Sequence, residues 1–177
     1  RNYDEGGSFS MAAAYLTRGT GPVFEWQAPY KNLRSAADVS FSPALKIDEI
    51  IFIPERKSAL DNQAIKQTVI NYGAVSASYV SVEEYYSSDD LSYYLPADYN
   101  AGRAPVGSSP VIATNHAIAI IGWDDNYSKE NFVTEPAGNG AFLCKNSWGT
   151  EFADNGYFYI SYYDGFLGIQ EFSMAFG

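Results

Sequence analysis

The chain has 177 residues, 46% of them hydrophobic and 18% charged, a globular composition long enough for one sizeable core or two small lobes. Its net charge of −10 argues against a phosphate-binding basic patch, so we exclude nucleic acid as a partner. No apolar run approaches the roughly 18 residues that a membrane span requires, so we expect no membrane span.

The first 45 residues are predicted to be helical and rich in loops. Small residues predict a short helix over 11–17, with Ser8 or Ser10 as its N-cap and Gly19 at its end. Repeated turn formers predict an irregular connection over 20–43. Three aromatic residues are expected to hold this connection against the core: Phe24, Trp26 and Tyr30.

The middle of the chain alternates strand and helix signals. The β-branched content of residues 46–53 predicts a strand, and Asp61 is expected to cap a helix that Gly73 ends. That helix places apolar side chains at near-helical spacing: Ile65, Val69 and Tyr72. A strand is predicted over 74–80, and the polar composition of 83–110 predicts a long surface excursion.

The last third of the chain contains four strand-like segments separated by turn signals. They span 116–123, 141–146, 156–163 and, more weakly, 170–176. Short antiparallel strands at this spacing predict a barrel or a curled sheet.

The single cysteine and the single histidine of the chain raise the question of a nucleophile and its base. His116 begins an apolar strand, where it could be a general base or a satisfied edge histidine. Asn146 could orient that ring or simply precede a turn. The lone cysteine excludes an internal disulfide, and we predict no metal and no cofactor.

Two motifs, NHAIAIIGW and KNSWGTEFADNGYFYI, resemble the histidine and asparagine strands of the papain family of cysteine peptidases. Gly6-Gly7 and INYGAVSASYV resemble the glycine pair and the entry into the barrel domain of that family. The resemblance implies an α+β, papain-like fold. Residues 1–45 would be the remainder of a helical left lobe, and 46–177 an antiparallel β-barrel right lobe carrying the active-site His and Asn.

The resemblance also implies residue roles. His116 would be the general base, Asn146 the residue that orients its ring, and Trp148 the indole that shields their hydrogen bond. Gly6 and Gly7 would pair with an extended substrate through the backbone. Three residues would line the pocket for the side chain two positions before the cleaved bond: Phe9, Ser78 and Ala117.

The family's nucleophilic cysteine lies ahead of its glycine pair, so the resemblance implies a nucleophile upstream of Arg1. Cys144 instead matches an ordinary apolar position of the asparagine strand, where burial should raise its pKa. The expected activity is peptide hydrolysis by thiolate acyl transfer. The expected partners are a peptide or protein substrate and the missing N-terminal part of the same protein.

Three alternatives stay open from the sequence. The chain could be a non-catalytic papain-like module that binds peptides or proteins, Cys144 could itself react, or the chain could be one piece of a cleaved enzyme. The disulfide-free, acidic composition and phrases such as GWDDN are similar to bacterial members that are secreted or on the cell surface, including multidomain ones with lectin-like modules.

Overall fold

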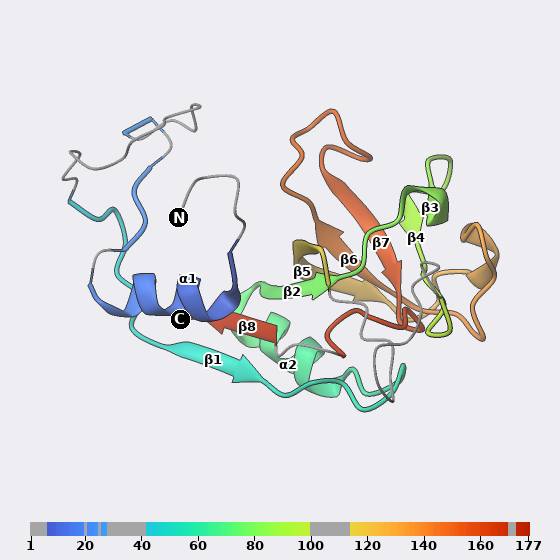
Figure 1. Cartoon of the computed structure of the whole chain (residues 1–177), viewed down its shortest axis with the longest axis horizontal. Coiled ribbons are helices and arrows are strands. Elements are labelled where there is room, and N and C mark those ends of the chain that lie inside the picture. The colour runs from blue at the N-terminus through green and yellow to red at the C-terminus, as the bar shows by residue number, and fades with distance from the viewer. Residues whose placement is uncertain (1–6, 20, 25, 28–41, 100–113, 170–172) are drawn as a thin grey trace, which may run out of the picture. The chain divides into compact units, whose positions relative to one another are not determined.

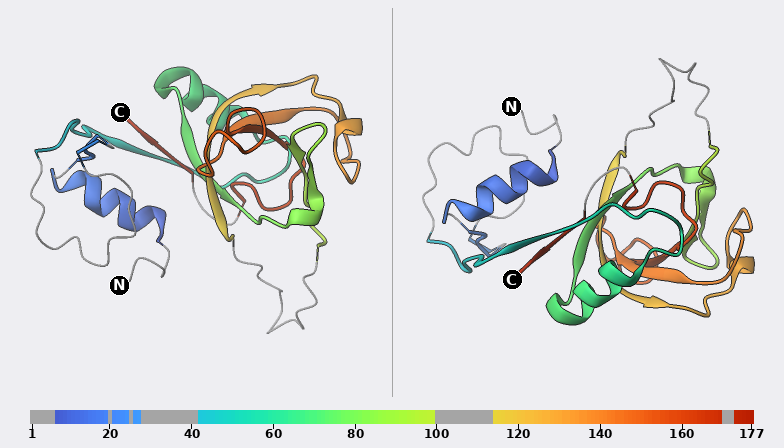
Figure 2. Two further views of the ribbon diagram at one scale, coloured as in Figure 1. Left: turned by 90° about the horizontal axis from the view of Figure 1, so that it is seen from above. Right: turned by 90° about the horizontal axis from the view of Figure 1, so that it is seen from below.

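The computed structural model describes residues 7–19, 21–24, 26–27, 42–99, 114–169 and 173–177 (Figures 1 and 2). The chain divides into two compact units, one of residues 1–51 with 176–177 and one of residues 52–175. Within the described residues, no helix has the length and apolarity that crossing a membrane would require.

The first unit contains the predicted short helix, α1, which spans Phe9–Thr17. Ser8 is its N-cap, because the Ser8 side chain accepts a hydrogen bond from the Met11 N–H at 3.4 Å. Ala13 is its buried residue, and Gly19 follows the helix with a φ of +79°. The helix therefore begins two residues earlier than predicted, and Ser8 rather than Ser10 caps it.

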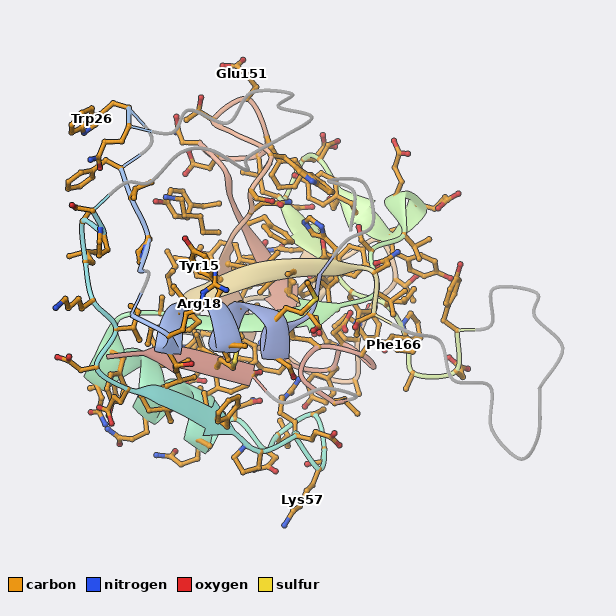
Figure 3. The ribbon with its side chains drawn as sticks, turned by 60° about the vertical axis from the view of Figure 1, so that its left-hand side comes forward. Tyr15, Arg18, Trp26, Lys57, Glu151 and Phe166 are labelled. Atoms are coloured by element: carbon orange, nitrogen blue, oxygen red, sulfur yellow. The ribbon has the colours of Figure 1, made fainter. Side chains whose placement is uncertain are left out.

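Phe24 and Trp26 do not hold the following connection against the core, contrary to the prediction. Their rings stack on each other with centroids 6.1 Å apart. The Phe24 side chain is 54% exposed, and that of Trp26, which is labelled in Figure 3, is 75% exposed. A tight turn closed between Phe24 and Gln27, through backbone and side-chain hydrogen bonds of 2.9 and 3.0 Å, accounts for this local arrangement. Tyr30 lies outside the described residues.

An eight-stranded sheet runs in the order β1-β8-β2-β5-β6-β7-β4-β3, with the strands labelled in Figure 1. The β2–β5, β5–β6 and β6–β7 pairs are antiparallel, as expected, whereas β4 pairs with β7 in parallel. The strand bounds are β1 Ile50–Ile53, β2 Val75–Tyr79, β3 Tyr86–Ser87, β4 Ser92–Tyr93, β5 His116–Asp124, β6 Ala141–Lys145, β7 Tyr157–Ser161 and β8 Ser173–Phe176.

Alternate residues of the central strands form the core of the second unit. The buried side chains are Val75, Ala77 and Tyr79 of β2, Ile118 and Ile120 of β5, Phe142 and Cys144 of β6, and Phe158 and Ile160 of β7. This two-residue period is that of a sheet whose inner face is buried, and it leaves the intervening side chains on the outer face.

Helix α2, Gln63–Tyr72, is the second predicted helix. Its N-cap is Asn62 rather than Asp61, because the Asp61 carboxylate accepts a hydrogen bond from the Lys57 N–H at 3.0 Å. Ile65 and Val69 are buried as the helical spacing predicted. Tyr72, in the last turn before Gly73, is 39% exposed and is not part of the buried face.

Residues 83–99 are only in part a surface excursion, because they contain a 3-10 helix, η1 (Glu83–Tyr85), and two short strands. Tyr93 and Leu95 are buried. The Tyr93 hydroxyl donates to the Val80 carbonyl at 2.6 Å, and the Leu95 N–H donates to the Asp164 carboxylate at 2.9 Å. These tertiary hydrogen bonds draw a polar sequence into the core, while residues 100–113 lie outside the description.

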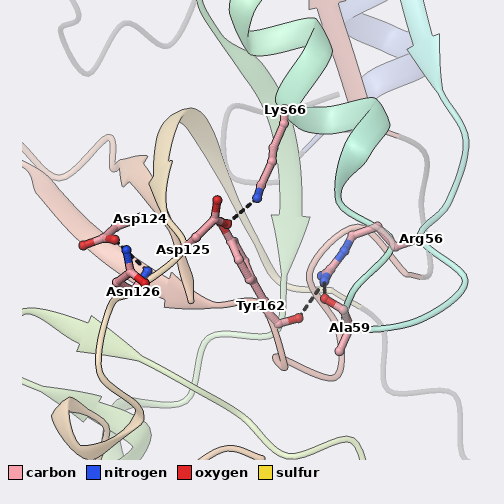
Figure 4. Close-up of polar contacts among 7 residues, drawn as sticks. All are labelled: Arg56, Ala59, Lys66, Asp124, Asp125, Asn126 and Tyr162. Atoms are coloured by element: carbon pink, nitrogen blue, oxygen red, sulfur yellow. Dashed lines mark hydrogen bonds and ion pairs between the residues drawn. The ribbon is translucent and has the colours of Figure 1, made fainter. Parts of the chain in front are cut away.

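Polar side chains link α2 and the segment before it to the sheet (Figure 4). Lys66 forms an ion pair with Asp125, which also accepts a hydrogen bond from the Tyr162 hydroxyl at 2.8 Å. The Arg56 guanidinium donates to the carbonyls of Ala59 and Tyr162, both at 2.6 Å. The acidic turn that holds Asp125 is therefore committed to internal contacts.

Candidate active site

His116 is the first residue of β5 and lies opposite Tyr79 of β2. The Tyr79 ring meets the imidazole edge to face, with centroids 5.7 Å apart. Asn115 anchors the strand start, since its side chain accepts from the Ser81 N–H at 2.6 Å and donates to the Ser81 carbonyl at 3.0 Å. The residue before His116 is therefore bonded to Ser81, and His116 itself is paired with Tyr79, which holds the start of β5 in place.

Asn146 follows β6 and meets His116 from the neighbouring strand. The distance from His116 Nε2 to Asn146 Oδ1 is 2.8 Å, and Asn146 is only 6% exposed. Since an amide oxygen only accepts, this contact places the proton on Nε2 and leaves Nδ1 to take up and release a proton. The Asn146 N–H donates to the Gly156 carbonyl at 2.9 Å, which fixes the backbone of the amide.

The Trp148 indole covers the imidazole. Its centroid lies 4.7 Å from that of His116 at an interplanar angle of 34°. Trp148 is 53% exposed and meets Phe152 edge to face at 4.9 Å, and Phe152 in turn contacts the buried Phe158 at 5.5 Å. A chain of aromatic contacts thus holds the indole over the histidine and limits the access of water to the His–Asn bond.

Of the predicted substrate-pocket residues, the structure brings two close to His116. Ser78 and Ala117 are partners in the β2–β5 ladder, one step along from the Tyr79–His116 pair. Ser78 is buried and Ala117 is exposed. Phe9 is the first residue of α1, in the first unit. Gly7 precedes that helix in the same unit, and Gly6 lies outside the described residues.

A cavity of about 430 Å³ adjoins Trp148 and was not anticipated from the sequence. Its lining includes Ser81, Val82 and Tyr86 beside the two aromatic residues Trp148 and Phe152. The adjacent tyrosines Tyr85 and Tyr86 were a sequence signal for an aromatic surface here, but the polar residues around them favoured the interpretation as a surface loop. The buried tyrosines at its base, Tyr79 and Tyr93, have pKa values raised by desolvation, so both stay neutral.

Cys144 is fully buried in β6, paired with Ile120 on one side and Phe158 on the other. Burial raises the pKa of its thiol, which disfavours the thiolate that nucleophilic attack requires. Its partner Ile120 is four residues along β5 from His116, about 13 Å at the strand rise. Cys144 is therefore a core thiol in this structure.

The residues described hold no group of three His, Cys, Asp or Glu side chains that could bind a metal ion. In the turn after β5, Asp124 accepts a hydrogen bond from the Asn126 N–H at 2.8 Å, and Asp125 is paired with Lys66. These carboxylates are engaged by the protein itself.

Residues 4–175 match the family model for papain family cysteine proteases. The "Cathepsin B-like cysteine proteinase 3" of Caenorhabditis elegans is 33% identical over 96 residues, which are 54% of this chain and 20% of that protein. Testin-2 of Mus musculus is 29% identical over 160 residues, which are 88% of this chain and 41% of that protein. The chain thus spans less than half the length of either relative.

Solved structures show the same fold. The cysteine protease and lectin-like domains of Cwp84, a surface layer associated protein of Clostridium difficile, match with a TM-score of 0.79 and 30% identity, over 99% of this chain and 37% of that one. The bromelain protease of Ananas comosus matches with a TM-score of 0.63 and 19% identity, over 97% and 70%. The predicted α+β, papain-like fold is confirmed. With the family model matching nearly its whole length, the chain belongs to the papain family of cysteine proteases.

Proposed function

We propose that the intact protein is a cysteine peptidase in which His116 is the general base and Asn146 orients its ring. The observation that carries this proposal is the 2.8 Å contact between His116 Nε2 and Asn146 Oδ1 beneath the Trp148 indole. A base held in one tautomer and one orientation is what nucleophilic catalysis by a thiol requires. Membership of the papain family supports the same general activity.

In the proposed reaction, a thiolate attacks the carbonyl carbon of a peptide bond. The carbon–nitrogen bond then breaks, and the leaving amine takes the proton that His116 carries on Nδ1. A water molecule next attacks the thioester and gives a proton back to Nδ1, which releases the acid and restores the thiolate. Asn146 keeps Nε2 engaged throughout, so that Nδ1 faces the reacting atoms.

We propose that the nucleophile comes from a part of the protein outside these 177 residues. The support is that Cys144, the only cysteine of the chain, is buried with a raised pKa. Residues 1–45 would then be the remainder of the left lobe and 46–177 the right lobe. The N-terminal part of the same protein is therefore a proposed partner of this chain.

Two proposed substrate subsites flank His116 along the strands. Ser78 and Ala117 lie on one side and would contribute, with Phe9, to a pocket for an apolar side chain. Gly6 and Gly7 would pair with the substrate backbone. On the other side, the cavity beside Trp148 would receive the part of the substrate that leaves as the amine.

A non-catalytic module is the second candidate, because the one cysteine in this chain is inaccessible. Labelling the intact protein with a thiol-directed epoxide, followed by peptide mass mapping, separates the two. We expect one modified cysteine that is not Cys144, with peptide hydrolysis lost in proportion to labelling. The variant Cys144→Ala should label and hydrolyse like the wild type. Peptide binding without labelling or hydrolysis would instead identify a binding module.

Replacing Trp148 with alanine should lower peptide hydrolysis by up to about 100-fold, because the imidazole loses the surface that positions it. Trp148→Phe keeps an aromatic face and should retain more activity. Since the indole is 53% exposed, the unfolding midpoint in urea should change little. Equal activity of the alanine and phenylalanine variants would contradict a positioning role for this ring.

We also propose that the protein is secreted or held at the cell surface, supported by its similarity to the surface layer associated Cwp84. Digestion of intact cells with an external protease tests this. The protein should disappear from intact cells while a cytoplasmic marker survives, and protection from the protease would contradict the proposal.

A further inference from the structure

A second cavity, of about 510 Å³, lies on the outer face of the sheet and shares no lining residue with the cavity beside Trp148. Its floor includes Ile121 of β5, Leu143 of β6 and Tyr159 of β7. Neighbours of these residues along the strands, such as Phe142 and Phe158, point into the core. This outer pocket is therefore separate from the proposed active site, and an inference about it does not depend on the peptidase proposal.

The walls of the outer pocket are held in place by the fold. A β-bulge between Ile120 and Gly122 leaves Ile121 without a ladder partner, and its side chain lines the pocket. The Tyr127 ring stacks on Tyr159 with centroids 4.2 Å apart. The Tyr127 hydroxyl also donates to the Asp90 carbonyl at 2.7 Å. These contacts make the pocket a preformed feature of the second unit.

Two exposed carboxylates, Asp90 and Asp154, also line the pocket, and none of the described residues that line it is Lys or Arg. One oxygen of Asp90 accepts from the Ser87 hydroxyl at 3.2 Å, and one oxygen of Asp154 accepts from the Asn155 amide at 2.8 Å. In each case these bonds orient the carboxylate through one oxygen only, so the other oxygen can accept from a ligand.

Lys145 and Lys129 lie near the residues that line the outer pocket, and each already contacts an aromatic ring or a carboxylate. The Lys145 ammonium lies 5.5 Å from the centroid of Tyr157, a tyrosine that also lines the pocket. Lys129 is paired with Glu135. The Tyr157 ring is thus already in contact with a cation of the chain itself, which leaves the carboxylates of the pocket as the groups for a ligand cation.

We propose that the outer pocket binds a basic side chain, arginine or lysine, from a protein or peptide partner. Carboxylates accept charge-assisted hydrogen bonds, and the Ile121 and Leu143 side chains suit an aliphatic stem. The volume falls within the range of ordinary ligand sites. The net charge of −10 favours the approach of a basic segment. A neutral saccharide fits less well, because the stacked Tyr127 and Tyr159 rings cover each other's faces.

Calorimetric titration of the full-length protein with tetra-arginine amide tests this proposal, after iodoacetamide has blocked hydrolysis. We expect saturable binding that weakens with added salt. Tetra-citrulline, which has the same shape without the charge, should bind at least about tenfold more weakly, the equivalent of about 1.4 kcal/mol. Saturable binding of cellotetraose with none of tetra-arginine would overturn the proposal in favour of a saccharide.

Variants locate the binding. The double variant Asp90→Asn and Asp154→Asn should weaken tetra-arginine at least about tenfold. Asp89→Asn with Glu151→Gln removes the same charge from exposed residues outside the lining and should bind like the wild type. Leu143→Arg, which places a guanidinium at the pocket, should also abolish binding, with folding checked by circular dichroism. Equal weakening in both double variants would overturn the pocket as the site.

Discussion

Peptide hydrolysis by the intact protein should fall by about 10²- to 10⁴-fold in kcat/KM when His116 is replaced with alanine, because the reaction loses its proton donor and acceptor. The substrate should be a short peptide with an apolar residue two positions before the cleaved bond. Lys57→Ala is the matched control and should keep full activity, because Lys57 is exposed and donates to Asp61 through its backbone N–H.

Asn146→Ala should lower kcat/KM by less, up to about 100-fold, since the amide acts only by holding the imidazole. The double variant should then be no worse than His116→Ala alone, because a positioning residue has nothing left to position. Additive losses in the double variant would show that Asn146 acts independently of His116.

The largest expected effect on stability is at Asp164, which is 0% exposed. Its carboxylate accepts backbone N–H bonds from Leu95, Phe166 and Leu167 at 2.9, 3.0 and 2.9 Å. Asp164→Ala leaves these buried donors unpaired and removes one of the two carboxylates, with Asp61, that interact favourably with the Arg56 guanidinium. We expect a loss of roughly 3–5 kcal/mol in the free energy of unfolding, measured with urea.

The stability contributed by Asp164 should also depend on pH. Desolvation raises the pKa of Asp164 to about 6, although the three N–H donors and Arg56 act in the opposite direction. The folded pKa thus lies above the unfolded value of 3.8, so the contribution is complete below about pH 3.8 and is lost as the pH rises through about 6.

The matched comparison is Asp164→Asn, which cannot titrate at this position. Relative to Asp164→Asn, the free energy of unfolding of the wild type should fall by up to about 3 kcal/mol between pH 4 and pH 7. Asp89→Asn, at an exposed turn, should follow the wild type at every pH. A wild type that gains stability over Asp164→Asn as the pH rises would contradict the raised pKa.

Periodicity in the sequence was sufficient to locate most of the regular elements. Helices α1 and α2 and strands β2, β5, β6 and β7 lie within a few residues of their predicted bounds, because apolar spacing and glycine ends are local signals. The strand predicted over 46–53 begins only at Ile50, and that predicted over 170–176 is described from Ser173. Errors at the ends of elements reflect capping and pairing partners that lie elsewhere in the chain.

Residues 83–99 show where local signals mislead. Their Ser, Asp and Tyr content resembles a surface loop, but Tyr93 and Leu95 are buried because distant groups satisfy their polar atoms. Composition carries no record of such partners. The same limit applies to Phe24 and Trp26. Their size suggested burial, but they lie at a local turn and their rings are exposed.

By itself, the sequence determined the local elements and the residue types of the site, because these depend on neighbours along the chain. Only the tertiary structure brought Asn146 Oδ1 to 2.8 Å from His116 Nε2, since residues 30 positions apart meet through the register of β5 with β6. The same pairing places Cys144 opposite Ile120 in the core. The bulge at Ile121 and the stacking of Tyr127 on Tyr159 form the outer pocket, because a cavity depends on contacts between strands that no single stretch of sequence contains.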